Sequence, residues 1–247
     1  MSAEVYHELH NNIIKERPGR LDYVDKAFHL LPKIDKPNIL DIGCGSGEPT
    51  IELAKLSNGM VTGIDIDKKA LDKFERKVKK QNLSDRIKII NLSMFAMDFP
   101  DESFDIIWSE GSIFVIGFEK GLLEWRSLIK PDGFLVVNDM CWLAPDPPRE
   151  IREHWQSVYP GITTIEKNLE MVPKCGYSMF DYFPFPVDAW GEIYFNPLEE
   201  RIESLREKFK NDSGALATLE KEYREVELYR KYKRWYGSAY FIVQKKM

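Results

Sequence analysis

The sequence is poor in the residues that form cross-links and metal sites. Its 247 residues include only three cysteines and four histidines. Cys44, Cys141 and Cys175 are widely separated and form no CxxC pair, and the histidines do not follow a metal-ligand spacing. We therefore expect neither a disulfide framework nor a bound metal. This cysteine usage is typical of proteins in the reducing cytoplasm.

Long apolar runs and an excess of positive charge are also absent. The run from Ile113 to Phe118 is far shorter than the roughly 20 apolar residues that cross a bilayer. Residues 1–20 have neither the basic nor the apolar region of a signal peptide. The 40 acidic and 35 basic residues give a net charge of −5, which does not favour a nucleic acid or an anionic membrane as partner. The basic and aromatic segment 230–236 is better explained as the end of a helix than as an RNA-binding surface.

Short apolar runs alternate with amphipathic stretches between residues 37 and 140. Turn residues bound each run, as they bound the buried strands of parallel sheets. The pattern predicts strands at 38–42, 61–64, 87–90, 104–108 and 134–138. Helices are expected at 49–56, from an N-cap at Asp67 to about Asn82, and at 121–129, with a turn at 130–133. This order predicts an α/β fold that binds its ligand at the carboxyl ends of the strands.

A glycine-rich loop follows the first predicted strand. The segment Asp41-Ile42-Gly43-Cys44-Gly45-Ser46-Gly47 places three alternating glycines between a strand and a helix, where the backbone can touch a ligand. Asp65 ends the second predicted strand, and a carboxylate there can accept both hydroxyl hydrogens of an adenosine ribose. The loop and the acid together predict a cofactor that contains adenosine.

The loop differs from that of a dinucleotide site. A G-x-G-x-x-G fingerprint needs glycine at its sixth position, where this chain has Glu48, and a carboxylate there would repel a pyrophosphate. Asp41, before the loop, suits a ligand that carries an amino group and no phosphate, such as S-adenosylmethionine. A nucleotide-dependent oxidoreductase is the less favoured alternative.

The runs ILDIGCGSG, TGIDID, WSEG and LIKPDGFLVV resemble those of the class I S-adenosylmethionine-dependent methyltransferases. The whole chain is similar to prokaryotic small-molecule members related to the ubiquinone/menaquinone C-methyltransferases. The resemblance implies a Rossmann-like three-layer sandwich with a seven-stranded, mostly parallel sheet and an antiparallel last strand. It implies one domain, 1–247, made of N-terminal helices (1–36), a cofactor-binding core (37–140), a substrate-side segment with strand six (141–197), inserted helices (198–236) and a last strand (237–247).

The resemblance also implies roles for single residues toward S-adenosyl-L-methionine, whose product is S-adenosyl-L-homocysteine. Asp41 and the loop match the positions that hold the methionine part, Asp65 the ribose acid, and Ile66 the residue that packs on adenine. Where many members have Asp-Ala at the adenine edge, this chain has Ser-Met. The implied cofactor-binding residues are Asp41, Gly43, Cys44, Gly45, Gly47, Asp65, Ile66, Ser93, Met94, Glu110 and Gly111.

The acceptor is expected to be a small molecule, methylated by in-line displacement without a metal. Glu110, at the end of the fourth predicted strand, is the candidate catalytic base, and a contact to the amine of the cofactor is its alternative role. Aromatic residues after the core are candidates to line an apolar or cationic acceptor, unless they serve ordinary packing. They are Trp142, Trp155, Tyr159, Trp190 and Tyr194. A protein that binds S-adenosylmethionine without transferring its methyl group remains a further alternative.

Overall fold

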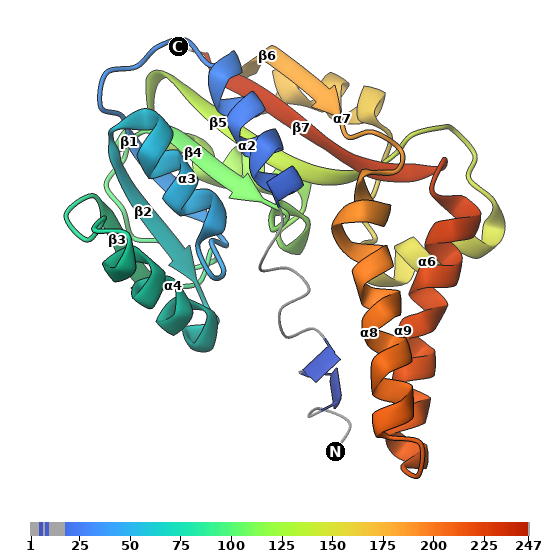
Figure 1. Cartoon of the computed structure of the whole chain (residues 1–247). Helices are drawn as coiled ribbons and strands as arrows, with labels where there is room; N and C mark the ends of the chain where they lie inside the picture. Colours follow the sequence, from blue (N-terminus) through green and yellow to red (C-terminus); the bar gives the residue numbers. More distant parts are fainter. Residues whose placement is uncertain (1–4, 7, 10–17, 247) are drawn as a thin grey trace.

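A single sheet forms the middle layer of the molecule (Figure 1). The computed structural model describes residues 5–6, 8–9 and 18–246. The sheet has seven strands in the order β3-β2-β1-β4-β5-β7-β6. The strands are β1 (Asn38–Ile42), β2 (Met60–Asp65), β3 (Ile87–Asn91), β4 (Phe104–Glu110), β5 (Ile129–Trp142), β6 (Tyr177–Pro184) and β7 (Tyr236–Lys245). The predicted Rossmann-like fold class is confirmed.

The first five strands are parallel and the last is not. β1 pairs in parallel with β2 and β4, β2 with β3, and β4 with β5. β7 lies between β5 and β6 and is antiparallel to both. β2 and β3 follow β1 on one side of the sheet, and β4 and β5 follow on its other side. The topological switch point therefore lies at β1, where the glycine-rich loop leaves that strand.

Helices cover both faces of the sheet because successive strand residues point to opposite sides. Trp108 and Val136 belong to the core shared with one group of helices, whereas Ile107 and Leu135 belong to the core on the other face. The first group is α2 (Pro18–Leu30), α3 (Glu48–Ser57) and α4 (Lys68–Lys80), and the second includes α5 (Phe118–Trp125) and α7 (Ile165–Met171). These layers are the expected three-layer sandwich.

The structure corrects one boundary. The predicted helix 121–129 begins earlier and ends at Trp125, a short 3-10 helix η2 (Arg126–Leu128) follows, and β5 already begins at Ile129. Ile129 is fully buried and pairs with Phe104, so strand pairing replaces the last helical turn. The predicted turn 130–133 therefore lies within β5, at an irregularity in its register with β4, where Asp132 has a φ of 60°.

The chain between β6 and β7 forms a helical hairpin that projects from the sheet (Figure 1). A π-helical segment η4 (Gly191–Phe195) leads into α8 (Asn196–Lys208), and α9 (Ser213–Tyr232) returns to β7. Asp212 caps α9 by accepting a hydrogen bond from the Ala215 N–H at 2.9 Å. Glu150 of α6 (Arg149–Val158) accepts hydrogen bonds from Lys231 and Tyr232, which ties the base of the hairpin to α6.

The structure describes only part of the amino-terminal segment for which helices are predicted. α2 is present, but most of the helix predicted before it lies outside the described residues. Within the described part of the chain, no helix has the length and apolarity needed to cross a membrane.

Candidate functional site

The glycine-rich loop is fastened to the carboxyl end of β2. The N–H groups of Gly43 and Cys44 both donate to the Ile64 carbonyl oxygen, at 2.9 and 3.0 Å. Gly43, Gly45 and Gly47 have φ values of 77°, 53° and 83°, a region in which side chains cause strain. The loop therefore depends on glycine at each of the three positions.

The three glycines have different surroundings. A Cβ atom on Gly43 would lie 2.4 Å from Ser112 and one on Gly47 would lie 1.9 Å from Phe74, so these two glycines allow close packing inside the protein. A Cβ atom on Gly45 would have no atom within 4 Å. Gly45 is thus the loop glycine that faces open space, where a ligand can approach the backbone.

Asp65 connects the loop to the end of β2. Its Oδ2 accepts a hydrogen bond from the Gly45 N–H and its Oδ1 one from the Asp67 N–H, both at 2.8 Å. Each carboxylate oxygen can accept more than one hydrogen bond, so both can still serve ribose hydroxyls. Ile66, the next residue, is 72% exposed, which leaves an apolar side chain beside the carboxylate.

Asp41 and Cys44 lie beneath the loop. Asp41 is 1% exposed, and its Oδ2 accepts a hydrogen bond from the Thr50 hydroxyl of α3 at 2.5 Å. Cys44 is also buried, and burial raises the pKa of its thiol far above the usual value. Asp41 can therefore hold the start of α3 in place, and Cys44 is an unreactive packing residue.

The loop after β3 lies next to Asp65. The Leu92 N–H donates to the Asp65 carbonyl oxygen at 3.0 Å, which brings the predicted Ser93–Met94 pair to the same edge of the sheet. The Ser93 hydroxyl accepts a hydrogen bond from the Phe95 N–H at 3.2 Å, and Met94 packs against the core. The Ser93 side chain thus shapes its own turn.

Glu110 ends β4 at the same edge of the sheet, and Gly111 follows it. Glu110 is 6% exposed, and its carboxylate accepts a hydrogen bond from the Tyr240 hydroxyl of β7. Asn138 of β5 lies between them in register, paired with both Glu110 and Tyr240. Gly111 has a φ of 60°, which turns the chain sharply after β4. Glu110 therefore lies between the strands that carry the glycine-rich loop and Asp65 and the β5–β7 half of the sheet.

The predicted substrate-side rings gather at the carboxyl end of β5, mostly in one cluster. Trp142 and Tyr159 are buried, and Trp155 and Trp190 pack beside them with residues of α9 and the start of β7. The Trp155 and Tyr236 rings are 5.0 Å apart, and the Trp190 Nε1–H donates to the Ser238 hydroxyl at 3.1 Å. Tyr194 packs mainly with the α8–α9 core and meets the Trp190 ring at 6.4 Å. Much of this aromatic surface is used for packing among the rings themselves.

The sequence interpretation missed a buried acid at the end of β5. Asp139 is 3% exposed, and burial raises its pKa from 3.8 to about 7. The Tyr159 hydroxyl donates to Asp139 Oδ2 at 3.1 Å, whereas Oδ1 has no hydrogen-bond partner among the described residues. The sequence signal that could have indicated this acid is the polar pair Asn138-Asp139, which ends the apolar run before Met140.

A second missed feature is a lysine that supports the loop. The Lys77 ammonium of α4 donates to the Ser46 carbonyl oxygen at 2.9 Å and forms an ion pair with Glu48, whose carboxylate also accepts from the Ser46 hydroxyl at 2.9 Å. The negative charge of Glu48 is therefore paired, which weakens the repulsion of phosphate expected from the sequence. In the described part of the chain, no group of three or more His, Cys, Asp or Glu side chains could hold a metal ion.

The chain is similar to known methyltransferases in sequence. A family profile described as a methyltransferase domain matches residues 39–133. The 27-O-demethylrifamycin SV methyltransferase of Amycolatopsis mediterranei (strain S699) is 26% identical over 79% of this chain and 72% of its own length. A sterol 24-C-methyltransferase of Gibberella zeae is 33% identical over 44% of this chain, but this match spans 28% of the sterol enzyme.

The same similarity appears among solved structures. A methyltransferase from Geobacter sulfurreducens, in complex with S-adenosyl-L-homocysteine, superposes with a TM-score of 0.80 and 17% identity over 98% of each chain. At this identity the comparison shows a shared fold. That fold extends over the hairpin and β7 as well as the region that the family profile matches.

Proposed function

Since this chain is a class I S-adenosylmethionine-dependent methyltransferase that acts on small molecules, we propose that its acceptor is an apolar molecule methylated on oxygen or carbon. The similar proteins include a 27-O-demethylrifamycin SV methyltransferase and a sterol 24-C-methyltransferase, names that refer to oxygen and carbon acceptors. Trp155 and Trp190 are only partly buried in the aromatic cluster, so their rings can still contact an acceptor with an apolar body.

The contact between Gly45 and Asp65 carries the assignment of the cofactor-binding residues. The 2.8 Å hydrogen bond puts the open face of the loop beside a carboxylate that can accept from a ribose, with exposed Ile66 next to it. These groups fit S-adenosylmethionine, which has an adenine, a ribose and a positively charged methionine part. In our proposal Asp65 holds the ribose, Ile66 packs on the adenine, and the Gly45 backbone contacts the methionine part.

The protein mainly has to align and deprotonate the acceptor. The cofactor supplies a methyl group on a sulfonium, which already carries its own leaving group. Holding the acceptor in line can contribute roughly 7–11 kcal/mol toward the barrier. For a hydroxyl or an acidic carbon, we propose that the Glu110 carboxylate accepts the proton and that the Tyr240 hydroxyl keeps that carboxylate oriented.

Calorimetry tests the cofactor assignment. We expect S-adenosylmethionine and S-adenosylhomocysteine to bind and NAD not to bind. Asp65→Asn, which keeps the shape of the side chain but removes its charge, should weaken S-adenosylhomocysteine about tenfold or more. Asp72→Asn, an exposed acid on α4, is the matched control and should leave the affinity unchanged. Unchanged affinity in Asp65→Asn would refute the ribose assignment.

A labelling experiment tests the acceptor class. The protein is incubated with a metabolite extract and S-adenosylmethionine that carries an isotope-labelled methyl group. Label should enter a product that partitions into an organic solvent. Label found only in water-soluble, charged products would contradict an apolar acceptor, while leaving the cofactor assignment untouched.

A further inference from the structure

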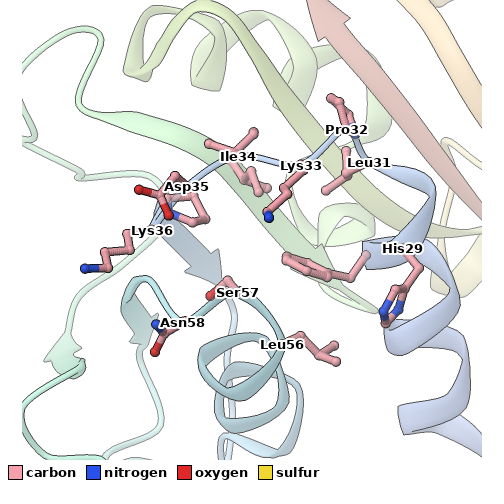
Figure 2. A pocket seen from close by; sticks show the side chains of 13 residues that line it. His29, Leu31, Pro32, Lys33, Ile34, Asp35, Lys36, Leu56, Ser57 and Asn58 are labelled. Atoms are coloured by element: carbon pink, nitrogen blue, oxygen red, sulfur yellow. The ribbon is translucent and has the colours of Figure 1, made fainter.

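A separate pocket opens at the amino-terminal edge of the sheet, opposite the glycine-rich loop (Figure 2). It has a volume of about 520 Å³ and lies between the end of α2, the linker that leads into β1, and the end of α3. This volume is within the range of roughly 300–1,000 Å³ that is typical of small-molecule sites. Since α3 begins at the loop and ends at the pocket, about 15 Å of helix separates the two.

The pocket combines apolar walls with a positive rim. Phe28, Leu31, Ile34, Leu56 and Ile106 supply the apolar lining, and Ile106 is 1% exposed. The rim carries the cations Lys33 and Lys36, the acid Asp35 and the imidazole of His29. The His29 ring nitrogen is already engaged, at 2.9 Å from the Asp25 carbonyl oxygen.

Lys33 is the cation best placed to meet a ligand. Figure 2 shows its ammonium within the ring of lining side chains, whereas the Lys36 side chain points away. Neither lysine forms an ion pair or hydrogen bond with a residue that the structure describes. An anion above the apolar lining would give Lys33 a partner of opposite charge.

Carbonyl oxygens at the end of α3, which borders the pocket, already accept hydrogen bonds within the protein. Its Leu53 carbonyl oxygen accepts from the Ser57 hydroxyl at 2.6 Å, and its Ala54 carbonyl oxygen accepts from Arg86 at 2.6 Å. The linker is anchored where it enters β1, because the Met60 N–H donates to the Pro37 carbonyl oxygen at 3.0 Å. The helix end that borders the pocket therefore has partners for these carbonyls without a bound cation.

We propose that this pocket binds a small organic anion with an apolar body, such as an aromatic or short aliphatic carboxylate. The apolar body would lie on the Phe28, Ile34 and Leu56 side chains, and the carboxylate would accept hydrogen bonds from the Lys33 ammonium. This site is distinct from the cofactor site and does not depend on the acceptor proposed above.

Two probes with the same ring system test the proposal. 2-Naphthoate and 2-naphthylmethylamine, which is a cation, are titrated into the full chain with excess S-adenosylhomocysteine to keep the cofactor site filled. We expect naphthoate to bind and the amine to bind more weakly by roughly fivefold or more, because one charge is attracted and the other repelled. Absence of naphthoate binding at millimolar concentration, or equal affinity for the two probes, would overturn the proposal.

Three variants locate the binding. Lys33→Glu should weaken naphthoate by roughly fivefold, whereas Lys36→Glu, the matched change on the outward-pointing side chain, should change it by less than about twofold. Leu56→Trp should remove binding by filling the pocket. The exposed lysine variants are expected to keep their melting temperature, so they remain informative if Leu56→Trp does not fold. Equal effects of the two lysine variants, or full binding in Lys33→Glu, would place the probe elsewhere.

Discussion

Three glycines in one loop serve different purposes, and substitution can separate them. Gly45→Ala should leave the fold largely stable, apart from about 1 kcal/mol of backbone strain, but weaken S-adenosylhomocysteine because the new methyl group occupies the open face. Gly47→Ala should lower the free energy of unfolding by about 2 kcal/mol or more, because its methyl group meets the Phe74 ring. Urea unfolding and calorimetry measure the two effects, and the opposite pattern would contradict the assignment of Gly45 to the ligand side.

Glu110 has two competing roles that kinetics can distinguish. If it is the base, Glu110→Gln should lower kcat about a hundredfold and leave the affinity for S-adenosylhomocysteine almost unchanged. Tyr240→Phe, which removes the hydroxyl that donates to Glu110, should lower kcat less. A variant with normal kcat and a raised Kd would instead assign Glu110 to the amine of the cofactor.

The buried Asp139 predicts a pH dependence of stability. Its pKa is about 3.9 in an unfolded chain and about 7 in the folded protein. Between these values the folded chain holds a proton that the unfolded chain has released. The stability contributed by this group is therefore complete below about pH 4 and is lost as the pH rises toward 7, by at most about 1.4 kcal/mol per pH unit.

Unfolding in urea between about pH 5 and pH 7 checks this expectation. Asp139→Asn should remove the contribution, so that its stability falls less steeply than that of the wild type. Tyr159→Phe removes a hydrogen bond that lowers the Asp139 pKa, so its loss of stability should continue to a higher pH. Identical slopes in wild type and Asp139→Asn would show that this carboxyl does not titrate in that range.

At the scale of elements, α4 supports the glycine-rich loop. The Lys77 side chain is 30% exposed, and its ammonium contacts both the Ser46 carbonyl oxygen and the Glu48 carboxylate. Lys77→Met should raise the KM for S-adenosylmethionine by roughly fivefold without lowering kcat at saturation, because it loosens the loop and not the reacting groups. Lys77→Arg should restore part of the affinity.

Lys79 provides the matched control on the same helix. Among the described residues its ion pair is with Glu75, on the solvent side, and its side chain is 67% exposed. Lys79→Met should therefore leave KM unchanged. A similar rise of KM in both variants would mean that the charge of α4, and not the specific contact of Lys77, supports binding.

Most elements were predictable because local signals determine them. The apolar run Asn38–Ile42 and the N-cap Asp67 both lie where the sequence places them. The helix-to-strand change at Ile129 was not predictable, because it depends on pairing with Phe104, which is distant in the sequence.

The same distinction applies to the candidate site. Loop spacing identifies Asp65 and the glycines, since their positions relative to strand ends are local. The roles of Lys77, Tyr240 and Asp139 depend on contacts across elements, and sequence periodicity does not reveal these. The gathering of rings from α6, η4 and α9 around Trp142 likewise follows from the return of the hairpin to β7.

At the scale of the whole molecule, we propose that 1–247 is one domain. The hairpin lies between β6 and β7 in the chain, and β7 lies between β5 and β6 in the sheet, so the hairpin cannot detach from the sheet as a complete unit. Tryptophan fluorescence and far-ultraviolet circular dichroism should therefore report one unfolding transition. Saturation with S-adenosylhomocysteine at a hundred times its Kd should stabilise the fold by about 2.7 kcal/mol. Two separated transitions would contradict a single domain.

The position of β7 has a consequence for synthesis. Translation delivers β6 and the hairpin before β7, yet β6 joins the sheet by pairing with β7. Until residues 236–245 leave the ribosome, the nascent chain therefore exposes the open edges of both β5 and β6. One strand, made last among the seven, closes both of these edges together, so a translational pause before Tyr236 would prolong the exposure of two edges open to intermolecular pairing.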